Sequence, residues 1–234
     1  MSDELSIRPG GFKVGGAIKI GDSTQKLTGL AARKAAALAQ AGIQEVAAPK
    51  TAAQMEHRIG IIFDDSSSMQ HAQLEDAKAG CEEFLRSCEK DNTAVAIYPM
   101  NSEELPLNTN LPAVAIMIKA INGYGNTPLV KRTAKMLKDN NLTRAIIFSD
   151  GAPDNYNIES LLEKKIPIDC VYIPSDYVSS DAENFLKNLA EKTGGIYLRF
   201  ERGKSNFRTA FKYLSPGLRH MLADKSFVDK LEGR

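Results

Sequence analysis

Short runs of apolar residues alternate along most of the chain with longer and more polar segments. The runs at 59–63, 144–149 and 167–173 are almost continuously apolar and rich in β-branched residues, which is typical of strands covered on both faces. The segments between such runs have the composition and spacing of helices. The alternation predicts an α/β fold with a doubly wound, mostly parallel (Rossmann-like) sheet that carries helices on both faces.

The same pattern gives the bounds of the expected elements. Six strands are expected, at 59–63, 93–99, 103–107, 144–149, 167–173 and 196–200, with 103–107 as a short antiparallel edge strand beside 93–99. Helices are expected at 70–89, 111–121, 128–139, 158–164, 181–192 and 205–214, with one or two more in 216–231. The expected core includes Ile61, Ile62, Val95, Ile97, Ile146, Ile147, Val171 and Ile196. The expected buried stripe of the 70–89 helix consists of Ala72, Ala79, Phe84, Leu85 and Cys88.

The pattern also divides the chain into three regions. Residues 1–58 are expected to form an N-terminal arm with a short strand at 14–20 and an Ala-rich helix at 28–40, since Ala is the strongest helix former. Residues 59–214 contain the strand and helix alternation and form the main domain. Residues 215–234 are expected to be a C-terminal helical extension.

Polar side chains gather where two of the expected strands end. Asp64-Asp65-Ser66-Ser67-Ser68 follows the first strand, and Ser149-Asp150-Gly151 closes the strand at 144–149. A Gly-rich loop at 123–127 presents Thr127 just before a helix. Ligands of open α/β sheets bind at the carboxyl ends of strands, and carboxylate and hydroxyl oxygens suit Mg²⁺ or Mn²⁺ better than zinc or copper. A Ser-rich turn can also simply cap the following helix.

The three segments, taken in this order and spacing, resemble the von Willebrand factor A (vWA) domain over residues 59–214. The motifs on which this resemblance rests are Asp-x-Ser-x-Ser after the first strand, Gly-x-Thr-Pro-Leu at 125–129 and an apolar strand that ends in Ser-Asp-Gly. The resemblance implies a vWA-type fold with a metal-ion-dependent adhesion site. The ligands that it implies are Asp64, Ser66, Ser68, Thr127 and Asp150.

The resemblance also implies a function. In the family, the cation keeps an open coordination position that accepts a Glu or Asp carboxylate from a partner protein. We therefore expect a non-enzymatic protein-interaction module that uses Mg²⁺ or Mn²⁺, for example as an adaptor for an AAA-type ATPase. Two alternatives stay open: a vWA scaffold that does not use its metal, and a nucleic-acid-associated protein that uses its basic C-terminal region.

Charge is unevenly distributed along a chain whose net charge is only +1. Residues 59–185 hold 11 Lys or Arg against 19 Asp or Glu, whereas residues 186–234 hold 11 against 5. The acidic middle would attract cations, and the basic C-terminal part would suit an acidic partner. No basic stretch is interleaved with aromatic residues, so we do not expect nucleic acid as the partner.

Enzymatic readings of the same motifs are incomplete. A haloacid-dehalogenase-type phosphatase would need a second acid two residues after its nucleophile, where this chain has Ser66. A response-regulator receiver would need its phosphoacceptor Asp ahead of its Thr, whereas Thr127 precedes Asp150. Neither enzyme class is therefore expected.

Cysteine usage and hydropathy bear on the compartment. Cys81 and Cys88 are about 10 Å apart along one expected helix, too far for a disulfide, and Cys170 lies in an apolar strand-like run. No apolar run approaches the length of a membrane span, and the first residues lack the apolar core of a signal peptide. We expect a cytoplasmic protein with reduced thiols and no membrane partner.

Overall fold

The computed structural model describes residues 50–69, 71–150, 153–174, 180–200 and 207–232. The strand expected at 14–20 and the Ala-rich helix expected at 28–40 lie outside the described residues. All the elements expected between 59 and 231 fall largely within the described part of the chain.

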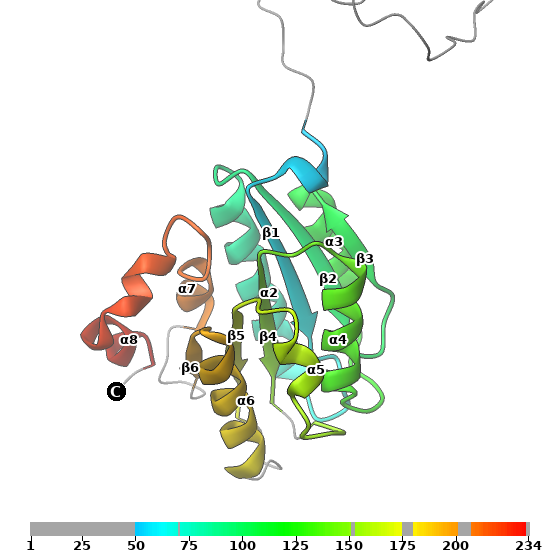
Figure 1. Ribbon diagram of the computed structural model, residues 1–234, viewed down its shortest axis with the longest axis vertical. Coiled ribbons are helices and arrows are strands. Elements are labelled where there is room, and N and C mark those ends of the chain that lie inside the picture. Colours follow the sequence, from blue (N-terminus) through cyan, green and yellow to red (C-terminus); the bar gives the residue numbers. More distant parts are fainter. Residues whose placement is uncertain (1–49, 70, 151–152, 175–179, 201–206, 233–234) are drawn as a thin grey trace, which may run out of the picture. The chain divides into compact units, whose positions relative to one another are not determined.

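Six strands form a single sheet in the order β3-β2-β1-β4-β5-β6 (Figure 1). Each neighbouring pair is parallel except β2 and β3, which are antiparallel at one edge. This arrangement confirms the predicted fold class, a doubly wound and mostly parallel vWA-like sheet with one short antiparallel edge strand. The strands are β1 (His57–Phe63), β2 (Thr93–Pro99), β3 (Leu105–Asn108), β4 (Arg144–Ser149), β5 (Ile168–Tyr172) and β6 (Tyr197–Arg199).

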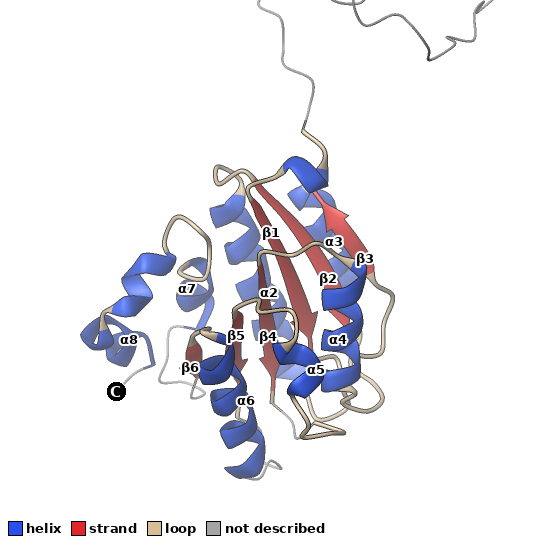
Figure 2. Ribbon diagram, viewed as in Figure 1, coloured by secondary structure: helices blue, strands red, loops and turns tan. Residues whose placement is uncertain are grey.

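Helices cover both faces of the sheet (Figure 2). One hydrophobic cluster joins the sheet to α2, α3 and α7, and a second joins its other face to α4, α5 and α6. The helices are α2 (His71–Cys88), α3 (Leu111–Ala120), α4 (Leu129–Asp139), α5 (Glu159–Leu162), α6 (Ser180–Thr193), α7 (Phe207–Lys212) and α8 (Lys225–Glu232), with 3-10 turns η1 (Ala52–Gln54) and η2 (Arg219–Ala223).

Successive residues of each central strand enter opposite clusters. Ile61 and Ile146 pack with α2, whereas their neighbours Ile62 and Ile147 pack on the other face. This explains the continuous apolar runs, because both faces of β1 and β4 are covered. Ile196 differs from the expectation: it is only partly buried and precedes β6, in which Leu198 is the buried residue.

The predicted stripe of α2 needs a correction. Ala72 is exposed and Ala79 is only half-buried, whereas the predicted Phe84, Leu85 and Cys88 are buried. In the first turns the buried face runs instead through Leu74, Ala77 and Cys81. The prediction took the wrong phase in the first turns, where Ala gives a weak periodic signal. All three cysteines are buried free thiols, as expected.

A buried carboxylate ties the C-terminal residues to the sheet. Asp169, in β5, is fully buried and accepts hydrogen bonds from Arg144 (3.2 Å), from Arg219 (2.7 Å) and from the Ile196 amide (2.8 Å). Arg144 also donates to the Leu214 carbonyl. Three separate stretches of chain therefore meet at one charge, which would be costly to leave unpaired.

Two neighbouring glycines in the turn between α6 and β6 allow a test of the backbone packing at this edge of the sheet. A Cβ on Gly195 would lie 1.9 Å from the carbonyl oxygen of Ile168, whereas one on Gly194 would meet no atom within 4 Å, although its φ is +72°. We expect Gly195→Ala to lower the free energy of unfolding by about 3 kcal/mol and Gly194→Ala by about 1 kcal/mol. Chemical denaturation of both variants measures the difference, and equal losses would contradict the packing described.

Candidate metal centre

The candidate ligands meet at the carboxyl edge of the sheet because β1 and β4 are parallel neighbours. Phe63 pairs with Phe148, so the residues that follow both strands emerge side by side. Asp64 comes directly after β1, and Asp150 comes directly after β4. The Asp64 amide also donates to the Phe148 carbonyl (3.0 Å), which extends the ladder by one residue. This edge is where open α/β sheets place their ligands.

Four of the five predicted ligands are joined by short hydrogen bonds. The Ser66 and Ser68 hydroxyls are 2.9 Å apart, and the Ser68 hydroxyl donates to Asp150 Oδ1 at 2.9 Å. The Ser66 amide donates to Asp64 Oδ1, also at 2.9 Å. Asp64, Ser66 and Asp150 are buried, whereas Ser68 is only half-buried. The cluster therefore opens to solvent on the side of Ser68.

Thr127, the fifth candidate, is held nearby through its loop. The Ser67 amide donates to the Gly125 carbonyl (3.1 Å), and the Tyr124 amide donates to the Asp65 carbonyl (2.7 Å). These bonds seat the 123–127 loop against the serine-rich loop. Thr127 is half-buried, and within the described residues no hydrogen bond joins its hydroxyl to the other four candidates.

Two residues that are not among the predicted ligands support the site. The Ser149 hydroxyl donates to Asp64 Oδ2 at 2.5 Å. Asp65 is fully buried and accepts from the Ser102 hydroxyl (2.5 Å) and the Asn101 amide (2.8 Å), so it fixes the loop after β2 rather than facing the serine cluster. The sequence signal for both was their place beside a predicted ligand, but only tertiary structure shows their partners.

Burial of two carboxylates together has an electrostatic cost. Burial, followed by the neighbouring Asp150 charge, raises the pKa of Asp64 from 3.8 to about 6, although hydrogen bonds from Ser149 and Ser66 act to lower it. The main contributions to this shift come from burial, one carboxylate and two serines, and none of them is a positive charge. A divalent cation would offset the repulsion, and the oxygen donors suit Mg²⁺ or Mn²⁺.

The composition of the site also narrows the class of metal. No group of three or more His, Cys, Asp or Glu side chains that could hold a metal exists within the described ranges. The candidate site has two carboxylates, and its remaining donors are hydroxyls. This donor set fits a hard cation that keeps part of its water shell, and it does not fit a structural zinc site.

Comparison with known proteins finds solved structures with a similar fold but no matching sequence family. No protein-family model matches the chain, and no curated protein matches it. An aerotolerance-related membrane protein from Bacteroides fragilis, crystallised with multiple mutations to serines, is 15% identical with a TM-score of 0.52, over 71% of this chain and 98% of that one. The pilus adhesin SpaC from Lactobacillus rhamnosus GG, in its open conformation, is 11% identical with a TM-score of 0.53, over 76% of this chain and 30% of that one.

A third structure, the vWF domain of the type V pili tip protein Mfa5 from Porphyromonas gingivalis, is 17% identical over 42% of this chain and 39% of that one. Its TM-score of 0.38 is too low to add to the argument. At these identities the likeness concerns the fold alone. The vWA-like fold is supported, and the metal site itself stays a prediction.

The raised pKa of Asp64 leads to a test of the metal centre. In the folded protein this acid holds its proton up to about pH 6, whereas its ordinary pKa is 3.8. Its contribution to stability is therefore present at low pH and is lost as the pH rises through 6. Without metal at pH 7.5, Asp64→Asn should raise the free energy of unfolding by about 1–3 kcal/mol, because it removes a buried charge.

The same variant should lose the stabilisation that Mg²⁺ or Mn²⁺ gives the unaltered chain. Thermal unfolding in MgCl₂, MnCl₂ and EDTA measures both effects. Glu163→Gln, which neutralises an exposed acid beyond the end of α5, is the control and should keep the metal response. Unchanged Mn²⁺ binding by Asp64→Asn in a calorimetric titration would refute the assignment of this ligand.

Proton competition gives a second prediction for this site. A cation requires Asp64 to be deprotonated, and its pKa is about 6. The shift in thermal midpoint caused by Mn²⁺ should therefore be larger at pH 7.5 than at pH 5. A shift of equal size at both pH values would show that Mn²⁺ binds elsewhere.

Proposed function

We propose that this protein is a non-enzymatic protein-interaction module that captures a partner's Glu or Asp carboxylate through a divalent cation. The observation that supports this proposal most directly is a chain of hydrogen bonds at the carboxyl edge of the sheet. It joins Asp64, Ser66, Ser68 and Asp150. The residues that would hold Mg²⁺ or Mn²⁺ are Asp64, Ser66, Ser68, Thr127 and Asp150.

The residue types at the site favour capture of an anion. Asp64 and Asp150 supply negative charge from the buried side, whereas Ser68 and Thr127 are half-buried and carry neutral hydroxyls. Neutral ligands on the accessible side leave the charge of a cation incompletely balanced. When bound, the cation would supply positive charge to which a partner's carboxylate can bind.

The wider role belongs to the same proposal. One structural neighbour is a pilus adhesin, and a role in protein contact agrees with that name. We propose a cytoplasmic adaptor whose partner could be an AAA-type ATPase. No helix within the described residues is long and apolar enough to cross a membrane.

The nucleic-acid alternative has little support from the basic region. Arg199 is paired with Glu183 at 2.9 Å, and Arg219 is paired with the buried Asp169 at 2.7 Å. These arginines hold elements of the domain together, so their charge is partly compensated. We therefore do not extend this alternative.

The capture of a partner gives a direct prediction. Thr127→Ala should weaken Mg²⁺-dependent capture of the partner while changing the thermal midpoint of the metal-free protein very little, because Thr127 lies in a surface loop. The measurement is a pull-down from the source cell in Mg²⁺ and in EDTA, followed by titration of the recovered partner. Thr109→Ala, in an exposed loop before α3, is the control.

Two outcomes would overturn the proposal. Capture that persists in EDTA and in Thr127→Ala would indicate a scaffold that does not use its metal. Hydrolysis of a generic aryl phosphate by the Mg²⁺-loaded protein, lost in Asp64→Asn, would indicate an enzyme. We expect no turnover and a capture that requires the cation.

A further inference from the structure

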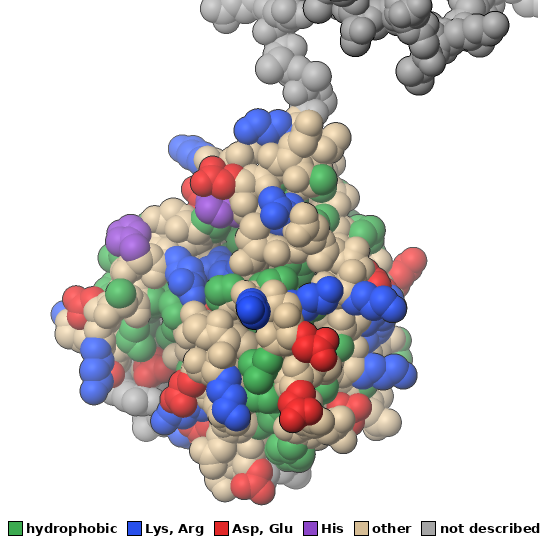
Figure 3. All heavy atoms as spheres, viewed as in Figure 1, with side chains coloured by type: hydrophobic (Ala, Val, Ile, Leu, Met, Phe, Trp, Pro, Cys, Tyr) green, Lys and Arg blue, Asp and Glu red, His purple; other side chains and the backbone are tan. Residues whose placement is uncertain are grey.

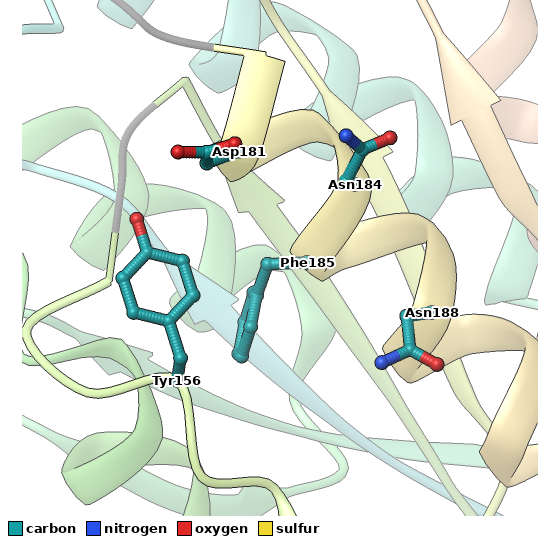
Figure 4. A pocket seen from close by; sticks show the side chains of 5 residues that line it. All are labelled: Tyr156, Asp181, Asn184, Phe185 and Asn188. Carbon is teal, nitrogen blue, oxygen red and sulfur yellow. The ribbon is translucent and has the colours of Figure 1, made fainter.

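A cavity of about 480 Å³ lies beside α6, outside the set of candidate metal ligands (Figure 4). Its size is within the range of small-ligand and side-chain pockets. None of its lining residues takes part in the hydrogen bonds that join Asp64, Ser66, Ser68 and Asp150. The lining residues are Tyr156, Asp181, Asn184, Phe185 and Asn188.

The lining follows from the helical repeat of α6 and from one aromatic pair. Asp181, Asn184, Phe185 and Asn188 are spaced so that they share one face of the helix. The rings of Tyr156 and Phe185 meet edge to face, with centroids 5.6 Å apart and planes at 90°. Tyr156 stays 52% exposed, although an aromatic ring of this size normally gains from burial. Half-exposed tyrosines of this kind often become anchors of interfaces.

The charge of the residues that line the cavity favours a positively charged group as its ligand. It has one carboxylate, two side-chain amides and a phenol, and the described residues that line it include no Lys or Arg. Figure 4 shows the Tyr156 hydroxyl directed toward Asp181, with Asn188 beyond Phe185. The space-filling view shows hydrophobic, acidic and basic side chains close together toward the lower end of this face (Figure 3). Such a lining is complementary to a cation with an extended planar surface.

Arginine meets these requirements better than any other side chain. Its guanidinium is planar, stacks on aromatic rings and carries five N–H donors. These donors can pair with the Asp181 carboxylate while the plane of the guanidinium lies against the Tyr156 ring. A lysine ammonium is a compact point charge that stacks less well and is more strongly hydrated.

One wall of the cavity is linked through the backbone to the candidate metal centre. The Asp154 amide donates to the Thr127 carbonyl at 3.1 Å, so the segment that carries Tyr156 is fastened to the loop that carries Thr127. Because α6 returns the chain to the parallel strand β6, it begins at the edge of the sheet where β1 and β4 end (Figure 1). The segment that carries Tyr156 and the start of α6 therefore lie at the same edge of the sheet as the candidate metal centre.

We propose that the cavity beside α6 receives an arginine side chain of the protein partner, next to the site that takes the partner's carboxylate. This inference rests on the proposed function and adds a second recognition element to it. Asp181 also lies in the first turn of α6, where a carboxylate stabilises a helix without any ligand. The test must separate these two roles.

The first experiment uses blocked amino acids as probes of the full chain labelled with ¹⁵N. Nα-acetyl-arginine N-methylamide is titrated in EDTA, and the side-chain amide signals of Asn184 and Asn188 are followed by NMR. The citrulline analogue has nearly the same shape without the charge, and the lysine analogue keeps the charge without the plane. We expect arginine to bind about tenfold more tightly than citrulline, the difference made by a charge-assisted hydrogen bond.

Variants then assign the contact. Asp181→Asn should remove the preference for arginine over citrulline, and Tyr156→Ala should weaken the binding of both. Glu191→Gln, an exposed acid at the other end of α6, is the matched control and should change neither. Equal binding of arginine and citrulline, tighter binding of lysine, or an arginine preference that survives Asp181→Asn would overturn the proposal.

A second experiment joins the two sites and distinguishes their failures. Peptides that carry one Glu and one Arg, separated by a variable number of glycines, are titrated in MgCl₂ and in EDTA. At one spacing, the affinity should exceed that of either single-residue peptide in Mg²⁺ and fall to the arginine-only value in EDTA. Arginine binding in a protein that shows no Mg²⁺ or Mn²⁺ binding would refute the metal function and leave the arginine pocket standing.

Discussion

The parallel pairing of β1 with β4 is the constraint on which the rest of the site depends. It fixes the register in which Phe63 lies beside Phe148, and therefore places Asp64 and Asp150 next to each other as the chain leaves the sheet. The two apolar faces of these strands make the position rigid, because both are covered by helices. Two acids are thereby held close together in a buried place, and the burial and then the Asp150 charge raise the pKa of Asp64.

Much of the fold could be predicted because its signals are local. Near-continuous apolar runs gave β2 and β4 with the bounds that the structure shows, and they placed the antiparallel edge strand next to β2. The prediction was weaker where the signal is faint, as at the start of α2, where alanines hide the phase of the buried face and Ala72 is exposed. The edge strand β6 is short, and its packing depends on neighbours distant in sequence, so Ile196 was placed too deep in the core.

The sequence was enough to predict the ligands of the candidate site, but not the hydrogen bonds that hold those ligands and their loops in place. Asp64, Ser66, Ser68 and Asp150 stand in motifs that can be read directly, and the structure brings them together. The contact of Asp65 with Ser102 joins residues 37 positions apart, and that of Ser149 with Asp64 joins residues 85 apart. The cavity beside α6 depends on a ring contact between Tyr156 and Phe185. No periodicity or motif marks such long-range contacts.

The ion pairs of Asp169 have a consequence for how the chain folds during its synthesis. β5 leaves the ribosome about fifty residues before Arg219, one of the two arginines that pair with its buried carboxylate. Until that arginine arrives, insertion of β5 into the sheet would bury an incompletely paired charge, which disfavours the closed domain. β1, β2 and β4 can already associate through their apolar faces at that stage. The domain would therefore fold in two steps. β5 and β6 would join the sheet only after nearly all of the described chain has been made.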